Sequence, residues 1–179
     1  MDLTEKTIES KRIYEGRVVN LRVDTVSLPN GRTSTREIIE HNGAVAIVPM
    51  LDARTVIMVK QFRQAAGQVL LEIPAGGMDD GEDPASAAGR ELSEEIGYYP
   101  QKLTEMFRSY LAPGYSSEML YTFIAEDLRR EVLPNDHDEF IEVVSIPLDE
   151  AIDMIRDGRI VDAKSICGLL IASRLFRGY

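Results

Sequence analysis

The segment from Gly76 to Tyr98 constrains the fold of this chain most, because it joins a glycine-rich loop to a short helix with clear start and end signals. Asp83 is a suitable N-cap, Pro84 suits the first helical position, and an alanine-rich run follows them. Gly97 can end the helix, since glycine readily adopts the left-handed conformation found after a last helical turn. The sequence therefore predicts a helix that begins after Asp83 and ends before Gly97.

Three glutamates of this predicted helix have a spacing that brings their carboxylates to one face. Glu91, Glu94 and Glu95 stand at positions i, i+3 and i+4, and Arg90 is the cation near them in sequence. Carboxylates this close repel one another, and a hard divalent cation such as Mg²⁺ or Mn²⁺ prefers their oxygen atoms. The pattern alone allows two interpretations, a metal site or a solvated acidic face.

The same segment resembles the signature of the Nudix hydrolases, G-x5-E-x7-R-E-U-x-E-E-x-G-U, in which U is a bulky aliphatic residue. Gly76, Glu82 and Leu92 occupy their places in this pattern, as do the arginine, the three glutamates and the second glycine. Tyr98 stands where the last aliphatic residue is expected, and its ring can fill an apolar position. The spacing is kept across a loop and a helix, so the chain is identified as a member of this family, and the metal site is the expectation.

The resemblance implies a role for each part of the segment. It makes Glu91, Glu94 and Glu95 ligands of Mg²⁺ or Mn²⁺, and the main-chain carbonyl of Ala75 completes the shell. It gives a structural role to the other defined positions, which are Gly76, Glu82, Arg90 and Gly97. Carboxylates that hold such a metal favour phosphoryl chemistry, because the metal neutralises developing charge and activates water.

The remaining pattern predicts an α/β protein with two parts. Arg17–Leu28 and Thr33–Glu40 read as an antiparallel hairpin that has too few large apolar residues to be stable alone. We expect residues 1–41 to be an N-terminal β segment, and residues 42–179 to be a Nudix domain, for which the resemblance implies an α/β/α sandwich. Further strands are predicted at 44–50, 55–62, 68–74, 103–110, 119–125 and 140–146, and helices at 149–156 and 163–175.

The last predicted helix is amphipathic, with apolar side chains available for packing at Ile166, Leu169, Leu170 and Leu175. Cys167 lies in the same helix and is expected to be a small core residue rather than a nucleophile.

Features outside the signature indicate a substrate. Arg63, Glu72 and Pro113 stand at positions that resemble the ADP-ribose pyrophosphatase branch of the family, and DAKSICGLLIA resembles the final helix of those enzymes. The resemblance implies that ADP-ribose and water give AMP and ribose 5-phosphate. Arg63 would contact the pyrophosphate, a natural use of a guanidinium, and Glu72 would bind ribose or adenine. Glu118 is a further substrate-binding candidate, and each of these charged residues could instead be an ordinary surface charge.

Two other functions fit the sequence less well. Another sugar nucleotide, such as GDP-mannose, shares the context of Arg63 and Pro113. A non-catalytic nucleotide sensor would use the same fold, but such domains typically lose signature glutamates, and this chain keeps them.

A general base is expected in the acidic loop before the last strand, by resemblance to the same branch. Glu139 is the first choice, with Glu94 as the other catalytic residue, and Asp136 and Asp138 are alternatives to Glu139. His137 stands where relatives often carry a glutamate, so it could assist at neutral pH or simply be solvated.

Charge and composition limit the partners and the compartment. The net charge of −10 argues against a nucleic acid partner, and no apolar run is long enough for a membrane span. One cysteine among 179 residues fits a reducing cytoplasm. The thin N-terminal hairpin needs an apolar surface to cover it, either its own core domain or a second copy of the chain. Enzymes of the resembled branch often pair two chains and exchange this segment, so a homodimer is expected.

Overall fold

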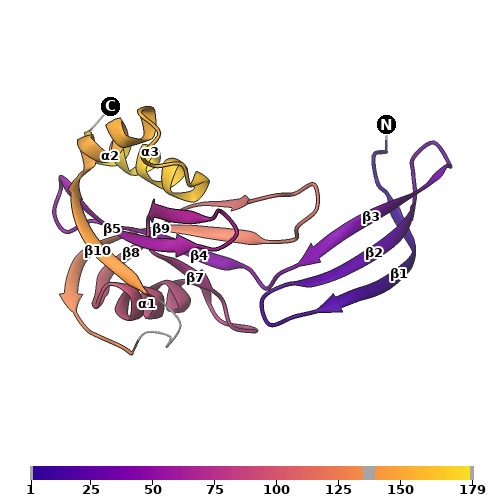
Figure 1. Ribbon diagram of the computed structural model, residues 1–179, viewed down its shortest axis with the longest axis horizontal. Helices are drawn as coiled ribbons and strands as arrows, with labels where there is room; N and C mark the ends of the chain where they lie inside the picture. Colours follow the sequence, from indigo (N-terminus) through magenta and orange to yellow (C-terminus); the bar gives the residue numbers. More distant parts are fainter. Residues whose placement is uncertain (1, 135–139, 178–179) are drawn as a thin grey trace. The chain divides into compact units, whose positions relative to one another are not determined.

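The computed structural model describes residues 2–134 and 140–177, and its contacts divide the chain into two compact units (Figure 1). Unit 1 comprises Met1–Gly43 and Ser109–Leu120, and unit 2 comprises Ala44–Arg108 and Tyr121–Tyr179. The first division falls close to the predicted boundary at residue 41. The inclusion of residues 109–120 in unit 1 has no signal in the sequence pattern.

Unit 1 is built on an antiparallel sheet of order β1-β2-β3 rather than on a hairpin. Its strands are β1 (Lys6–Glu15), β2 (Asn20–Ser27) and β3 (Thr33–Glu40). The sequence predicts β3 and, with an early start at Arg17, β2, but it does not predict β1. All ten residues of β1 are exposed, so the strand has no buried face and lacks the alternation by which a strand is recognised.

The segment 109–120 belongs to unit 1 because its main chain bonds to the end of β3. The Ile39 amide donates to the Tyr115 carbonyl at 2.7 Å, and the Ser117 amide donates to the Ile39 carbonyl at 2.9 Å. The His41 amide donates to the Ser117 hydroxyl at 3.1 Å. These bonds place the loop that carries Pro113 in unit 1.

Unit 2 contains two sheets, of order β10-β5-β6 and β7-β4-β9-β8. The strands are β4 (Ala44–Pro49), β5 (Thr55–Arg63), β6 (Gln68–Glu72), β7 (Ala75–Gly77), β8 (Tyr98–Tyr110), β9 (Met119–Arg130) and β10 (Ile141–Pro147). The end of β8 and the start of β9, from Ser109 to Tyr110 and from Met119 to Leu120, belong to unit 1. The predicted strands are all present, but β8 begins earlier and β9 ends later than expected. The sequence gives no sign of β7, which is three residues long with two glycines.

Helices cover both faces of these strands, so the predicted α/β/α sandwich is confirmed (Figure 1). α1 (Pro84–Glu95) lies on one side, and α2 (Leu148–Arg156) and α3 (Ala163–Arg177) lie on the other. The core beneath α1 is a cluster of buried side chains from α1, β4, β5 and β9; these include Ala88, Leu92, Val45, Ile47, Val59 and Phe123. None of the described helices is both long and apolar enough to cross a membrane.

α3 meets the strands through its small residues, which differs from the predicted packing by leucines. Leu169 is fully buried, but Leu170 is 44% exposed and Leu175 is 61% exposed. A Cβ atom added to Gly168 would lie 3.1 Å from Ile73 Cδ1, so the helix backbone closely approaches the core. Because α3 packs on the strands through the face that carries Gly168, the side chains of Leu170 and Leu175 are left exposed to solvent.

Cys167 is exposed on α3, so its predicted place in the core was wrong. Gly168, the next residue along α3, faces the strands, so the side chain of Cys167 points to solvent instead.

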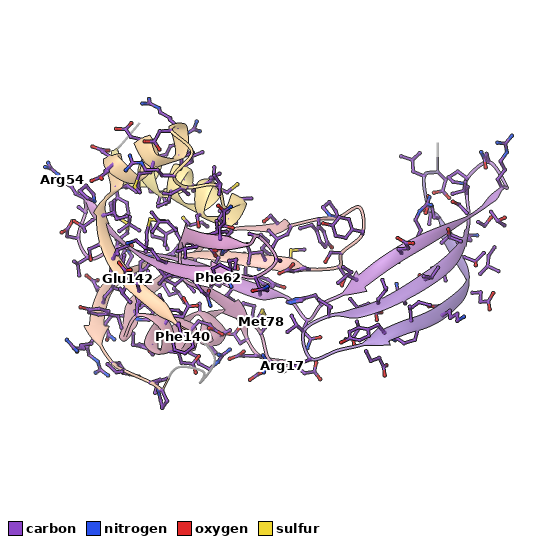
Figure 2. All side chains as sticks on the ribbon, in the orientation of Figure 1. Arg17, Arg54, Phe62, Met78, Phe140 and Glu142 are labelled. Atoms are coloured by element: carbon purple, nitrogen blue, oxygen red, sulfur yellow. The ribbon has the colours of Figure 1, made fainter. Side chains whose placement is uncertain are left out.

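Aromatic side chains are exposed at the carboxyl end of β5. Phe62 is 55% exposed, and Phe140, just before β10, is 85% exposed (Figure 2). Val69, which pairs with Phe62 across β5 and β6, is 59% exposed. Phe62 and Val69 therefore form an exposed apolar pair on the surface of unit 2.

Candidate active site

α1 begins and ends where the sequence predicts. The N-cap Asp83 accepts a hydrogen bond from the Ser86 amide at 3.0 Å, and Pro84 is the first helical residue. Gly97 follows the helix with a φ of 73°, the left-handed conformation that glycine adopts without strain. Leu92 is completely buried beneath the helix. These contacts fix the rotation of α1, and the rotation decides where its glutamates point.

The Arg90 guanidinium lies at the centre of the glutamate cluster. Its Nε and Nη2 donate to the two oxygens of Glu82 at 3.0 and 2.9 Å. Its Nη1 donates to Glu91 at 2.8 Å and to Glu94 at 3.0 Å. The bonds to Glu82 and the neighbouring glutamate charges raise the pKa of Arg90, and the same bonds lower the pKa of Glu82. One arginine thus orients three carboxylates.

Strand β7 lies directly against the glutamate face of α1. A Cβ atom added to Gly76 would be 2.0 to 2.2 Å from the carboxylate atoms of Glu91, so only glycine fits here while Glu91 keeps this position. The Ala75 amide donates to Glu95 Oε2 at 3.3 Å, and Glu95 is only 7% exposed. The structure therefore brings the residues of β7 and the glutamates of α1 together, as a shared site requires.

The donor set suits a hard divalent cation. Three carboxylates lie around the Arg90 guanidinium, those of Glu82, Glu91 and Glu94, and a fourth, Glu95, is bonded to the Ala75 amide. Cations such as Mg²⁺ prefer carboxylate oxygen. Within residues 2–134 and 140–177, no three acidic, histidine or cysteine side chains already surround a cation position. Three of the four glutamates are instead bonded to Arg90. The chemistry of the site fits a metal that would offset the excess negative charge.

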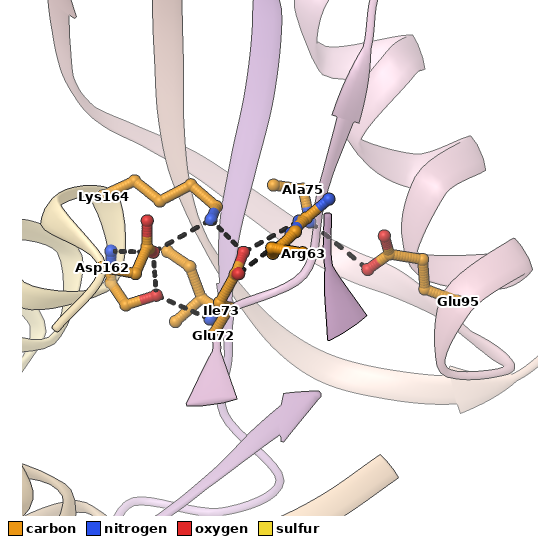
Figure 3. Close-up of polar contacts among 8 residues, drawn as sticks. Arg63, Glu72, Ile73, Ala75, Glu95, Asp162 and Lys164 are labelled. Atoms are coloured by element: carbon orange, nitrogen blue, oxygen red, sulfur yellow. Dashed lines mark hydrogen bonds and ion pairs between the residues drawn. The ribbon is translucent and has the colours of Figure 1, made fainter. Parts of the chain in front are cut away.

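A second polar cluster is centred on Glu72 and joins β5, β6 and α3 (Figure 3). Arg63 Nε and Nη2 donate to the two oxygens of Glu72 at 2.9 and 2.8 Å, and Lys164 Nζ donates to the same carboxylate. Glu72 is 1% exposed. Burial raises the pKa of Glu72, but the Arg63 hydrogen bonds and the Lys164 charge outweigh it, so the pKa is lowered. This buried carboxylate is ionised and engaged by two cations.

The other predicted site residues belong to unit 1 or fall outside the described residues. Pro113 is exposed and Glu118 is half-buried, and both belong to unit 1. Glu139 and the other loop candidates, Asp136, His137 and Asp138, fall outside the described residues.

Sequence reasoning missed the part of α3 that joins the Glu72 cluster. The sequence pattern assigns no site role to Asp162 or to Lys164. Lys164 lies 92 residues from Glu72, and no local pattern marks a pairing over that distance. A lysine near a helix start gives no signal of its own, so only the folded structure reveals the contact.

Comparison with known proteins places these clusters in a family context. The model of the NUDIX domain matches residues 40–168, and that of the nucleoside diphosphate sugar hydrolase N-terminal domain matches residues 5–39. An ADP-ribose pyrophosphatase of Bacillus subtilis (strain 168) is 43% identical over 91% of this chain and 89% of its own. A GDP-mannose pyrophosphatase of Yersinia pestis (strain Pestoides F) is 36% identical over 70% of this chain and 67% of its own. The crystal structure of an ADP compounds hydrolase superposes with a TM-score of 0.88 at 26% identity, covering 99% of this chain and 97% of that one.

Proposed function

Because this chain belongs to the Nudix family, we propose that it is a pyrophosphatase that hydrolyses ADP-ribose, or a closely related nucleoside diphosphate sugar. ADP-ribose would give AMP and ribose 5-phosphate. In that reaction water attacks one phosphorus, the bond from this phosphorus to the bridging oxygen breaks, and the bridging oxygen leaves with the second phosphate. The proton lost by the water passes to a base.

The observation that carries this proposal is the glutamate face of α1, which lies within the matched NUDIX domain. Gly76 packs directly against Glu91 on this face, and Arg90 donates a hydrogen bond to the same carboxylate. A solvated acidic helix would not require a glycine opposite its carboxylate, whereas a Cβ atom added to Gly76 would lie only 2.0 Å from the Glu91 carboxylate. The identity to an ADP-ribose pyrophosphatase extends over 91% of the chain, which supports the choice of substrate.

Nudix hydrolases use a divalent metal, and we propose that this one uses Mg²⁺ or Mn²⁺. Glu91, Glu94 and Glu95 would hold it, with the Ala75 carbonyl. When bound, the metal would activate a water molecule and offset the charge that develops on the phosphates. Arg90 would keep two of the ligands oriented through its bonds to Glu91 and Glu94.

Arg63 is proposed to bind the pyrophosphate. Its side chain is 38% exposed. The hydrogen bonds to Glu72 raise the pKa of Arg63, and the nearby charge of Glu95 adds to this effect. We keep Glu139 as the proposed general base and Glu94 as the other catalytic residue. Glu118 and Pro113 remain proposed substrate contacts.

We also propose a homodimer built through residues 1–41, acting in the cytoplasm. All ten residues of β1 are exposed, including Ile8 at 60%, Ile13 at 50% and Tyr14 at 58%, and a second copy of the chain could cover them. Light scattering of the intact protein tests this, because a dimer has twice the 20.0 kDa of one chain. A fully active monomer at micromolar concentration would refute it.

A second candidate substrate is GDP-mannose, favoured by the 36% identity to a GDP-mannose pyrophosphatase. The deciding experiment is a panel of ADP-ribose, GDP-mannose, NADH, diadenosine polyphosphates and an 8-oxo nucleotide, each with Mg²⁺ and with Mn²⁺. We expect AMP release from ADP-ribose with kcat/KM at least about tenfold above that for GDP-mannose, a difference of about 1.4 kcal/mol. The reverse order would support the second candidate, and cleavage of none would refute the proposed function.

A further inference from the structure

The first residues of α3 are bonded to the end of β6. Asp162 Oδ2 accepts from the Ser165 amide at 3.0 Å and from the Ser165 hydroxyl at 2.5 Å, so the carboxylate caps the helix. The same oxygen accepts from Lys164 Nζ at 2.9 Å. Ser165 Oγ in turn accepts from the Ile73 amide at 2.8 Å. The start of α3 is therefore attached to residues 72–73 through both a side chain and the backbone (Figure 3).

Lys164 is the group that bridges the two carboxylates of this cluster. Its ammonium bonds to Glu72 and to Asp162, and its side chain is only 11% exposed. Glu72 is almost inaccessible to water, so it depends on protein donors for its hydrogen bonds. Without the ammonium, two carboxylates would face each other here and the Arg63 guanidinium alone would satisfy Glu72.

The arginine on the other side of Glu72 is held in a defined orientation. Arg63 uses one edge of its guanidinium, Nε and Nη2, for the two Glu72 oxygens. Its Nη1 has no hydrogen-bond partner within the part of the chain that the structure describes, and the side chain is 38% exposed. A guanidinium bound by one edge can offer the other to a phosphate oxygen, and the direction of that second edge is set by the first.

From these contacts we infer that Lys164 is a positioning residue, which immobilises Glu72 so that Arg63 presents its remaining edge to the pyrophosphate of the substrate. The inference rests on the proposed function and adds a residue to it. Within the described residues, the hydrogen bonds of Lys164 run to Glu72 and Asp162, and not to the glutamates of α1. Its effect is transmitted through Glu72 and then through Arg63.

The test is a double-mutant cycle on the substrate that the panel identifies as best cleaved. Lys164→Met keeps the apolar stem and removes the ammonium. We expect kcat/KM to fall about tenfold, mainly through a higher KM, because the lost orientation weakens binding to the pyrophosphate. In an Arg63→Ala background the same substitution should change kcat/KM by less than about twofold, since the residue through which Lys164 acts is then absent.

Three further variants complete the design. Lys102→Met removes an exposed lysine, 58% accessible and paired with Glu126, and should leave kcat/KM unchanged. Lys164→Arg restores a cation and should recover most of the loss. Lys164→Gln replaces the Met variant in the cycle if that variant does not fold.

The outcomes separate the two proposals. A wild-type protein that cleaves no pyrophosphate substrate refutes the proposed function and the inference with it. If the wild type is active, a Lys164→Met or Lys164→Gln variant that folds and keeps the wild-type KM refutes the inference alone. An effect of Lys164→Met that persists at full size in the Arg63→Ala background also refutes it.

Discussion

Replacing Gly76 by alanine tests whether the contact between β7 and α1 forms the active site. The added Cβ would lie 2.0 Å from the Glu91 carboxylate carbon, whereas carbon atoms in contact are normally about 3.5 Å apart, so one of the two groups has to move by about 1.5 Å. The atoms in the way are the far end of a flexible side chain. Glu91 can therefore swing away, and the overpacking should cost near the lower end of about 1–3 kcal/mol.

That movement should be far more costly for the reaction than for folding. Glu91 would leave its 2.8 Å bond to Arg90 and its place among the proposed metal ligands. Displacement of a catalytic group by about 1 Å can cost about 100-fold in rate. We expect Gly76→Ala to lose about that much in kcat/KM, while its Tm falls by only about 2–4 °C for each kcal/mol of lost stability.

A matched control lies one residue away. A Cβ atom added to Gly77 would meet nothing within 4 Å, so Gly77→Ala should keep the activity of the wild type. Steady-state kinetics with Mg²⁺ and a thermal melt of both variants decide the matter. The reasoning is refuted if Gly76→Ala keeps activity within about threefold of wild type, or if Gly77→Ala loses as much.

Three more substitutions test the metal site, the core and the buried carboxylate. Glu95→Gln should abolish nearly all turnover yet hold or raise the metal-free Tm, because it removes a ligand and a repelling charge; near-normal turnover would show that the cluster is not the site. Leu92→Ala should cost about 2–5 kcal/mol in urea unfolding, since Leu92 is fully buried, whereas Leu175→Ala at 61% exposure should cost less than about 0.5 kcal/mol. The pKa of Glu72 is lowered in the folded state, so its ionised form stabilises the fold at pH values above 4.5, the ordinary pKa of a glutamate. This stabilisation is lost as the pH falls through the folded-state pKa. Wild type should therefore lose stability more steeply than Glu72→Gln as the pH falls below 4.5, and parallel urea midpoints at pH 6 and pH 3 would contradict this.

The parts of the fold that sequence could predict are those with strong local signals. Asp83, Pro84 and Gly97 mark the ends of α1, and the buried strands of unit 2 are rich in β-branched residues. β1 could not be found in this way, because a strand exposed on all ten residues carries no alternation. The packing face of α3 was also hidden, since Gly168 makes the close approach while Leu170 remains exposed.

The candidate site also has one part that local sequence signals predict and one part that only the folded structure reveals. Residues within the signature share one helix and one loop, so their spacing alone brings the glutamates together. The Glu72 cluster instead depends on a meeting of β5, β6 and α3. Sequence could propose Arg63 and Glu72 by resemblance, but it could not show that they bond to each other or that Lys164 joins them.

The outward-facing thiol of Cys167 also makes α3 directly accessible to labelling chemistry. It is the single cysteine of the chain, so a maleimide fluorophore or a nitroxide would attach at one known position without further engineering. The label would stand three residues from Lys164 along the helix, where changes around the Glu72 cluster can alter its environment. Emission could then report substrate binding in real time, and two nitroxides in a paired assembly would give the separation of the two copies of α3 by electron spin resonance.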